Sequence, residues 1–171
     1  MISCEPSVSI SALVTATPGS LVRFEGAFGF VVVSENDPAP NPVRRIATYN
    51  RTTHRFERAM PEGVEVFDFG STLVLEPDLE SVSEGELPSE ESGSEALLVG
   101  KEFNVVVHLS RTQFRLLELS TGVLKALNPP PLLKAFKRWS IGVRDARGRY
   151  TPLIVATPRL AAAVDEGPIG P

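Results

Sequence analysis

The residues best suited to chemistry are a run of cations and aromatic rings between positions 134 and 150. Positive side chains can neutralise phosphates or carboxylates, and aromatic faces can stack on the bases of single-stranded nucleic acid. We therefore treat this run as the candidate binding surface. Its members are Lys134, Lys137, Arg138, Trp139, Arg144, Arg147, Arg149 and Tyr150.

Three interpretations of this basic stretch are open. It can bind nucleic acid, it can be a plain hairpin surface with Trp139 inside and the arginines outside, or it can contact an acidic protein partner. The chain itself offers such a partner, because residues 76–95 hold eight acidic and no basic side chains. That pairing can form within one chain or between subunits.

A second group of arginines surrounds a predicted hairpin in the first half of the chain. Arginine is suited to two-pronged contact with carboxylates or phosphates. Glu57 and Glu62 lie close by in sequence, so we expect an interface or a surface network here. The group comprises Arg44, Arg45, Arg51, Arg55 and Arg58, with Tyr49 and Phe56.

Catalytic and metal-binding patterns are weak. The two histidines are far apart: we expect His108 on a strand face and His54 exposed in the arginine-rich hairpin. A two-histidine metal site would also need a carboxylate, and no serine lies in a G-x-S-x-G setting. We predict a non-enzymatic protein with no cofactor and no metal.

The segment FEGAFGFVVV, residues 24–33, places Gly26 and Gly29 before a run of valines. A dinucleotide or P-loop motif needs a different glycine spacing and a helix after the loop. Glycine within a strand pattern usually marks a bend, a bulge or a close backbone approach. We predict a bend between two strands.

Period-two alternation and turn residues indicate short strands throughout. A half-buried strand is expected over 8–14, strands at 21–24 and 28–33, two more about a turn near 50–52, and a pair over 64–75 that turns at 70–71. Later strands are expected at 103–109, at 113–119 and 123–127, and on either side of 145–148. Residues 132–137 are expected to form one or two helical turns.

These elements predict an all-β fold, a small barrel or sandwich of short antiparallel strands. It forms either one compact unit or two barrel-like halves joined by an acidic flexible segment, which is too polar to bury much surface. The expected divisions are an N-terminal β unit at 1–78, an acidic loop or linker at 79–96, a C-terminal β unit at 97–160 and a flexible tail at 161–171.

Charge is segregated along this chain of 171 residues and net charge −4. Residues 1–75 carry a net −2, residues 76–95 a net −8 and residues 96–171 a net +6.

Cys4 is the only cysteine, so no disulfide can form within one chain. The N-terminal residues lack the pattern of a secretory signal, and no apolar run is long enough to span a bilayer. We expect a soluble intracellular (cytoplasmic) protein, or a virion protein if the chain is viral.

The stretch TPGSLVRFEGAFGFVVVSE, residues 17–35, resembles the small β-barrel structural proteins of virus particles, such as the head-decoration proteins of tailed phages. The resemblance implies a barrel that binds a capsid lattice through loops and termini, and it assigns no functional residue. We predict a structural or accessory subunit of a larger assembly that contacts other protein subunits, as a homo-oligomer or in a capsid lattice. The alternative is a nucleic-acid-binding β-barrel that uses residues 134–150.

Overall fold

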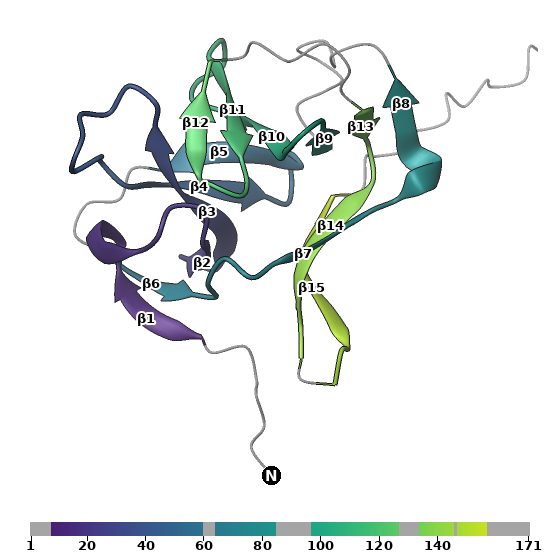
Figure 1. Cartoon of the computed structure of the whole chain (residues 1–171), viewed down its shortest axis with the longest axis horizontal. Coiled ribbons are helices and arrows are strands. Elements are labelled where there is room, and N and C mark those ends of the chain that lie inside the picture. Colours follow the sequence, from purple (N-terminus) through teal and green to yellow (C-terminus); the bar gives the residue numbers. More distant parts are fainter. Residues whose placement is uncertain (1–7, 60–63, 85–96, 127–133, 146, 157–171) are drawn as a thin grey trace, which may run out of the picture.

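The computed structural model describes residues 8–59, 64–84, 97–126, 134–145 and 147–156; within them the regular elements are β-strands and two short 3-10 helices (Figure 1). No helix in these ranges is long and apolar enough to cross a membrane. The first elements are β1 (Ser9–Ala12), η1 (Leu13–Thr15), β2 (Leu21–Phe24), β3 (Ala27–Ser34), β4 (Arg45–Asn50), β5 (Arg55–Ala59), β6 (Glu65–Asp68) and β7 (Val74–Pro77). Then come η2 (Leu79–Ser81), β8 (Val82–Glu84), β9 (Leu97–Val99), β10 (Phe103–His108), β11 (Phe114–Glu118), β12 (Val123–Lys125), β13 (Lys134–Phe136), β14 (Trp139–Arg144) and β15 (Tyr150–Ala156).

Six strands close into a barrel. Strands β3, β4 and β5 form one antiparallel meander, and β10, β11 and β12 form a second. Parallel pairing of β5 with β10 and of β3 with β12 joins the two meanders into a ring. Closure satisfies backbone groups that an open sheet would leave unpaired. The prediction of an all-β fold is confirmed, with further strands attached around a barrel.

Two valine-rich strands form the centre of the hydrophobic core because both of their faces are buried. In β3, Phe30 and Val32 point into the main core, whereas Val31 packs in a second cluster with Leu13 and Val66. Strand β10 is similar: its residues 105 and 107 belong to the main core, and residue 106 belongs to a third cluster with side chains from β9, β11 and β13. Strands buried on both faces are expected to have continuous apolar runs of this kind.

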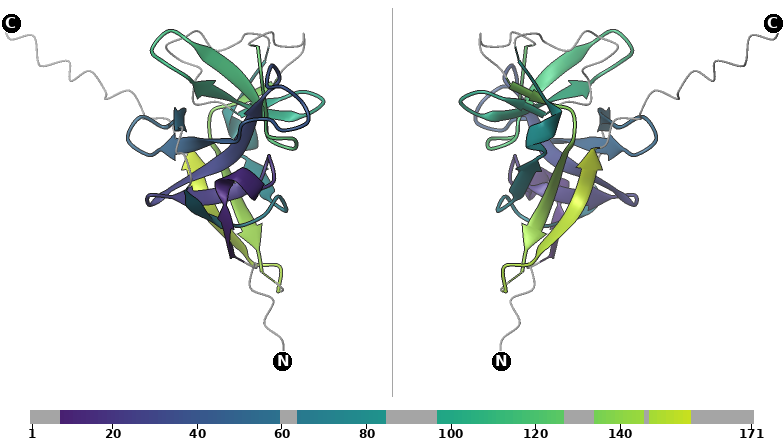
Figure 2. Two further views of the ribbon diagram at one scale, coloured as in Figure 1. Left: turned by 90° about the vertical axis from the view of Figure 1, so that its left-hand side faces the viewer. Right: turned by 90° about the vertical axis from the view of Figure 1, so that its right-hand side faces the viewer.

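The barrel strands belong to a large sheet of 12 strands, and the three described strands outside it form a separate sheet in the order β15-β14-β7. We call this sheet the arm, because its β14–β15 hairpin extends away from the barrel (Figures 1 and 2). The base of the arm belongs to the main core, where Trp139, Ile141 and Ile154 are buried. The hydroxyl of Tyr49 in the barrel also donates to the carbonyl of Val155, 3.3 Å away. The arm is therefore fixed at its base and exposed at its far end.

The glycines of residues 24–33 form a turn and a close approach, as predicted. Glu25 and Gly26 have φ of 47° and 81° and form the tight turn between β2 and β3. Gly29 lies against β4, where a Cβ would come within 2.4 Å of the carbonyl oxygen of Ala47. Strands lie on both sides of the turn, so the segment has no helix N-terminus for a phosphate.

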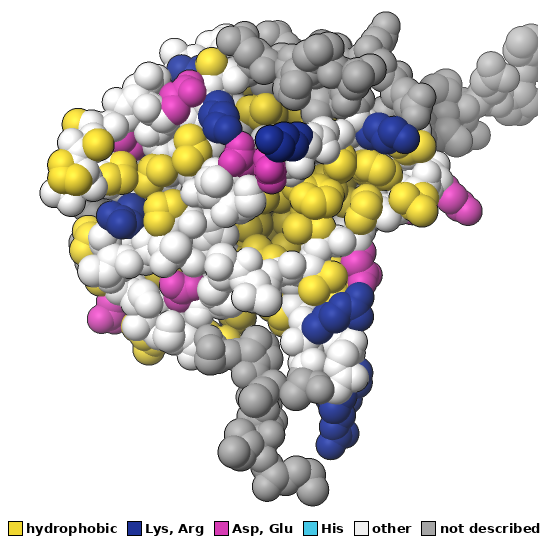
Figure 3. Space-filling model, in the orientation of Figure 1, with side chains coloured by type: hydrophobic (Ala, Val, Ile, Leu, Met, Phe, Trp, Pro, Cys, Tyr) yellow, Lys and Arg dark blue, Asp and Glu magenta, His cyan; other side chains and the backbone are white. Residues whose placement is uncertain are grey.

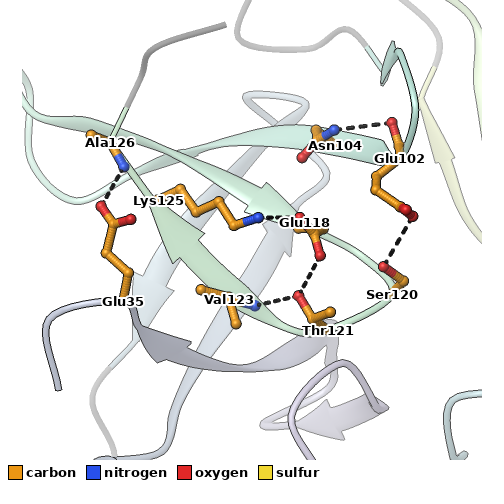
Figure 4. Close-up of polar contacts among 9 residues, drawn as sticks. All are labelled: Glu35, Glu102, Asn104, Glu118, Ser120, Thr121, Val123, Lys125 and Ala126. Atoms are coloured by element: carbon orange, nitrogen blue, oxygen red, sulfur yellow. Dashed lines mark hydrogen bonds and ion pairs between the residues drawn. The ribbon is translucent and has the colours of Figure 1, made fainter. Parts of the chain in front are cut away.

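Polar contacts hold the β11–β12 hairpin against neighbouring strands (Figure 4). The backbone N–H of Ala126, after β12, donates to the carboxylate of Glu35, after β3, at 2.8 Å. Within the hairpin, Lys125 and the hydroxyl of Thr121 donate to Glu118. The hydrogen bond from Lys125, followed by that from Thr121, lowers the pKa of Glu118 against the opposing effect of burial.

Strands from before and after the acidic segment lie in one sheet, through β5–β10 and β3–β12. The described residues therefore form one barrel, with strands from both sides of the acidic segment. Residues 79–84, expected within the flexible linker, form η2 and β8, with Asp78 accepting a hydrogen bond from the N–H of Glu80 at 2.9 Å. Residues 85–96 and the predicted tail at 161–171 lie outside the described residues.

The N-terminal segment differs from the half-buried strand predicted over 8–14. Strand β1 covers only Ser9–Ala12, and the chain then forms η1. Ile10 and Val14 are 66% and 65% exposed, whereas Leu13 is buried. The alternating pattern indicated a strand but not which of its side chains would meet the core.

Two other predictions are wrong. Residues 64–75 do not form a hairpin, because β6 pairs with β1 and β2 whereas β7 pairs with β14 in the arm. The helical turn predicted over 132–137 is replaced in its described part by β13, which pairs with β9 on one side and β8 on the other. Two neighbouring strands supply backbone partners that outweigh the local preference for a helix.

Candidate functional site

The predicted binding residues lie on β13, on the β14–β15 hairpin and in the connections beside them, but their cations and rings point in different directions. The six Lys and Arg side chains are exposed. Trp139 is 4% exposed, and its ring stacks on that of Phe56 with centroids 6.2 Å apart. Tyr150 is half-buried, with its hydroxyl 2.8 Å from that of Ser140 and the guanidinium of Arg144 over its ring. The indole of Trp139 is thus part of the core and is not available to stack on a base.

Two arginines of this stretch pair with carboxylates from the start of the acidic segment. Arg138 donates to Asp78 at 2.7 Å, and Arg144 donates to Glu76 at 2.8 Å. Strand β7 brings both acids to this position by pairing with β14. Of the partners predicted for the basic stretch, it is the chain's own acidic residues that bind Arg138 and Arg144. Each pair is nearly half exposed, so it contributes at most about 1 kcal/mol.

The far end of the arm is a hydrogen-bonded turn that carries arginines outward. The backbone N–H groups of Arg147 and Arg149 both donate to Oδ1 of Asp145 at 2.9 Å, and the guanidinium of Arg149 donates to Oδ2 at 2.6 Å. The backbone hydrogen bond from Arg149 is the largest cause of the lowered pKa of Asp145. Arg147 is exposed in this turn, and dark blue Lys and Arg side chains cover this end of the arm in Figure 3.

The second arginine group does not form one surface. Arg44 donates from Nε to the carbonyl of Ala16 at 2.7 Å. Arg45 binds Asp37 through two hydrogen bonds of 2.7 and 3.2 Å, and this partner holds the pKa of Asp37 below its ordinary value. Arg51 is exposed in the β4–β5 turn. Within the described residues this group therefore has one ion pair, Arg45 with Asp37 from the preceding loop, and not the expected pairing with Glu57; Glu62 lies outside the described residues.

The two histidines lie in different surroundings. His54 is half-buried rather than exposed; it occupies the β4–β5 turn with φ of 55°, and its Nδ1 lies 3.2 Å from the hydroxyl of Tyr49. His108 ends β10 on the outer face, with its ring 4.6 Å from that of Phe114. In the described part of the chain, no group of three or more His, Cys, Asp or Glu is placed to hold a metal ion.

Arg55 and Arg58, the remaining arginines of the second group, line a pocket of about 390 Å³ together with His108. We call it the rim pocket, because it lies at the end of the parallel β5–β10 pair, where His108 is opposite Glu57. Burial is the main cause of the lowered pKa of His108, and the charge of Arg55 adds to it. Sequence spacing could not indicate this site, since its two segments are about fifty positions apart. The lining residues are Arg55, Glu57, Arg58, His108, Leu109, Ser110 and Arg111.

Exposed apolar side chains gather at one end of the large sheet. Strand β1 is the last strand there, and among the described strands it pairs only with β6. Ile10 on β1 lies opposite Phe67 on β6; they are 66% and 52% exposed. Val8, two residues before Ile10, is 47% exposed. We call Val8, Ile10 and Phe67 the edge patch.

Fold and surface together define a β-barrel protein with an attached arm, a basic rim pocket and an apolar sheet edge. None of the protein-family models, curated proteins or solved structures compared with the chain matches it. Its function is therefore inferred from its own residues.

Proposed function

We propose that the chain is a non-enzymatic structural or accessory subunit of a larger assembly, a virion protein of the capsid-decoration type, that acts through contacts with other protein subunits. The edge patch is the observation that carries this proposal. Apolar side chains gathered on an exposed face are typical of protein–protein contact sites.

The position of the edge patch favours a subunit as its occupant. Strand β1 has a partner strand on one side only among the described strands, so backbone groups on its other side, apart from the Ala12 carbonyl that accepts from Ala16 and Thr15, are available to a strand from a neighbour. A neighbouring strand could bond to this backbone while apolar side chains cover Ile10 and Phe67. The closed barrel would hold the edge in a fixed orientation for such a contact.

The setting proposed for this assembly is the cytoplasm, with the finished particle as the final location. A single cysteine fits a reducing compartment, where disulfides are rare. Arg147, which is exposed at the far end of the arm and forms no ion pair within the described part of the chain, supplies a second contact for acidic neighbours.

The test is the mass of the purified chain in solution, measured by sedimentation over a range of protein and salt concentrations. We expect association that Ile10→Lys or Phe67→Lys abolishes, because a buried lysine would lack a partner at the interface. Val155→Lys is the matched control, since Val155 is 52% exposed on β15 in the arm. A strict monomer at every concentration and salt would overturn the proposal, and equal loss of association in the control would exclude the edge patch.

A nucleic-acid-binding function for residues 134–150 has less support. Its best-placed ring, Trp139, is stacked in the core, and Arg138 and Arg144 already have carboxylate partners. If it were correct, affinity for single strands would fall steeply with salt. It would also be lost when Arg138, Arg144 and Arg147 are replaced by alanine.

A further inference from the structure

The rim pocket is built by two strands that are distant in sequence. Parallel pairing sets Val107 opposite Phe56 and His108 opposite Glu57. Because side chains alternate along a strand, Arg55 and Glu57 lie on the face of β5 opposite the core residue Phe56. The chain after β10 then adds Ser110 and Arg111.

Positive charge in the rim pocket is not balanced from within. Three arginines face one carboxylate, which leaves a formal excess of two positive charges. That carboxylate, Glu57, already accepts hydrogen bonds from the amide of Asn50 at 3.3 Å and the hydroxyl of Thr53 at 3.2 Å. Within the described part of the chain, Arg55, Arg58 and Arg111 form no ion pair.

Two polar atoms at the rim pocket are buried and lack a hydrogen-bond partner in the described structure, Nε of Arg55 and Nε2 of His108. Buried nitrogens of this kind are nearly always bonded in folded proteins. The arginines on the arm differ, since Arg138, Arg144 and Arg149 each reach a carboxylate. Nε of Arg45 is also buried without a partner although Arg45 pairs with Asp37, so the stronger sign of a missing acceptor is that no arginine of the rim pocket has an ion-pair partner among the described residues.

The number of donors favours one class of acceptor. Each guanidinium offers several N–H groups in a planar fork, the hydroxyl of Ser110 adds a donor, and Nε2 of His108 adds another in the tautomer that is protonated there. A carboxylate has two oxygens to receive them, whereas a phosphoryl group has three or four. A volume of about 390 Å³ also exceeds what a bare ion needs and falls in the range of small-molecule pockets.

We propose that the rim pocket binds a phosphate-class oxyanion, either the free ion or a phosphate monoester, through Arg55, Arg58, Arg111 and His108. This site is separate from the edge patch, and binding there does not depend on assembly. Glu57 stays bonded to Asn50 and Thr53 and limits the ligand to the arginine side of the pocket.

The two histidines allow a direct test on the unaltered protein. Imidazole resonances of His54 and His108, the only histidines, are followed by NMR while inorganic phosphate, phenyl phosphate or acetate is added at constant ionic strength. We expect a saturable shift at His108 with phosphate, phenyl phosphate or both, and an unchanged His54. Tighter binding of phenyl phosphate identifies a monoester, and tighter binding of phosphate identifies the free ion. No saturation at His108, or equal binding of acetate, overturns the proposal.

Variants separate a specific site from general attraction to positive charge. Arg58→Gln and Arg111→Gln change exposed side chains, so the fold should persist, and each should weaken phosphate binding about tenfold through loss of a charge-assisted hydrogen bond. Arg147→Gln at the exposed end of the arm is the matched control and should change the affinity no more than about twofold. An equal loss in the control would show that no specific site exists.

Discussion

The barrel and the arm are both built from short strands, but they differ in whether their sheet edges are paired and in how exposed their ion pairs are. In the barrel, each of the six strands is paired on both sides, and valine-rich strands are covered on both faces. The arm is an open three-stranded sheet with exposed arginines at and beside its β14–β15 turn. The barrel's Asp37 and Arg45 side chains are 10% and 15% exposed, whereas the arm's Glu76 and Arg144 are nearly half exposed.

This contrast indicates a division between stability and recognition. All six barrel strands contribute buried apolar side chains to the core, so we expect these strands to determine the free energy of unfolding. Surfaces outside the barrel core, which are the arm, the edge patch and the rim pocket on the outer side of β5 and β10, can bind other molecules without opening the core. Substitutions that affect one region and spare the other test this division.

The largest effect is expected at the point where barrel and arm meet. Phe56 is 1% exposed and contacts the rings of Phe30, Tyr49 and Trp139. We expect Phe56→Ala to lower the free energy of unfolding by about 3–5 kcal/mol, measured by urea denaturation, because it opens a cavity. Phe103→Ala, at a side chain 40% exposed, is the control and should cost much less. Equal losses in the two variants would contradict a shared core.

A smaller effect is expected inside the arm. Gly142 lies at the irregularity of the β14–β15 pairing, and a Cβ there would approach the carbonyl oxygen of Thr151 to 2.1 Å. We expect Gly142→Ala to cost about 1–3 kcal/mol by forcing the strands apart. Hydrogen exchange should quicken in β14 and β15 while β10 and β11 stay protected. Equally fast exchange in the barrel would show that the two regions unfold as one unit.

The smallest effect concerns acid stability. Arg45 holds the pKa of Asp37 below its ordinary value of 3.8, so this group stabilises the fold above that pH, and the stabilisation is lost as pH falls through the folded pKa. We expect Asp37→Asn to cost about 1 kcal/mol at neutral pH and to flatten the loss of stability in acid. Thermal melting at several pH values measures both.

Asp145→Asn is the control for this pH prediction. Asp145 also has a lowered pKa, but it lies at the exposed end of the arm, outside the core. Its replacement should change the turn and leave the melting temperature of the barrel unchanged. If both variants behaved alike, the carboxylates of barrel and arm would be equivalent, and the contrast between the regions would fail.

The sequence by itself determined the all-β class and most local hairpins. Alternating residues with turn residues between them indicated the strands around Gly26, Asn50, Gly122 and Asp145, because a hairpin depends on residues close together in the chain. The bend at Gly26 followed from the missing helix after the glycines. The basic stretch over residues 134–150 was also identified from the sequence, because its Lys and Arg residues are close together in the chain.

Only the tertiary structure decided which distant strands pair and which faces are buried. Parallel pairing of β5 with β10 created the rim pocket, and pairing of β7 with β14 brought Glu76 to Arg144. The tertiary structure also leaves the side chain of Ile10 exposed and places that of Trp139 in the core. Alternation and turn chemistry specify neighbours a few residues away, whereas non-local pairs are selected by the apolar surface that the whole chain buries.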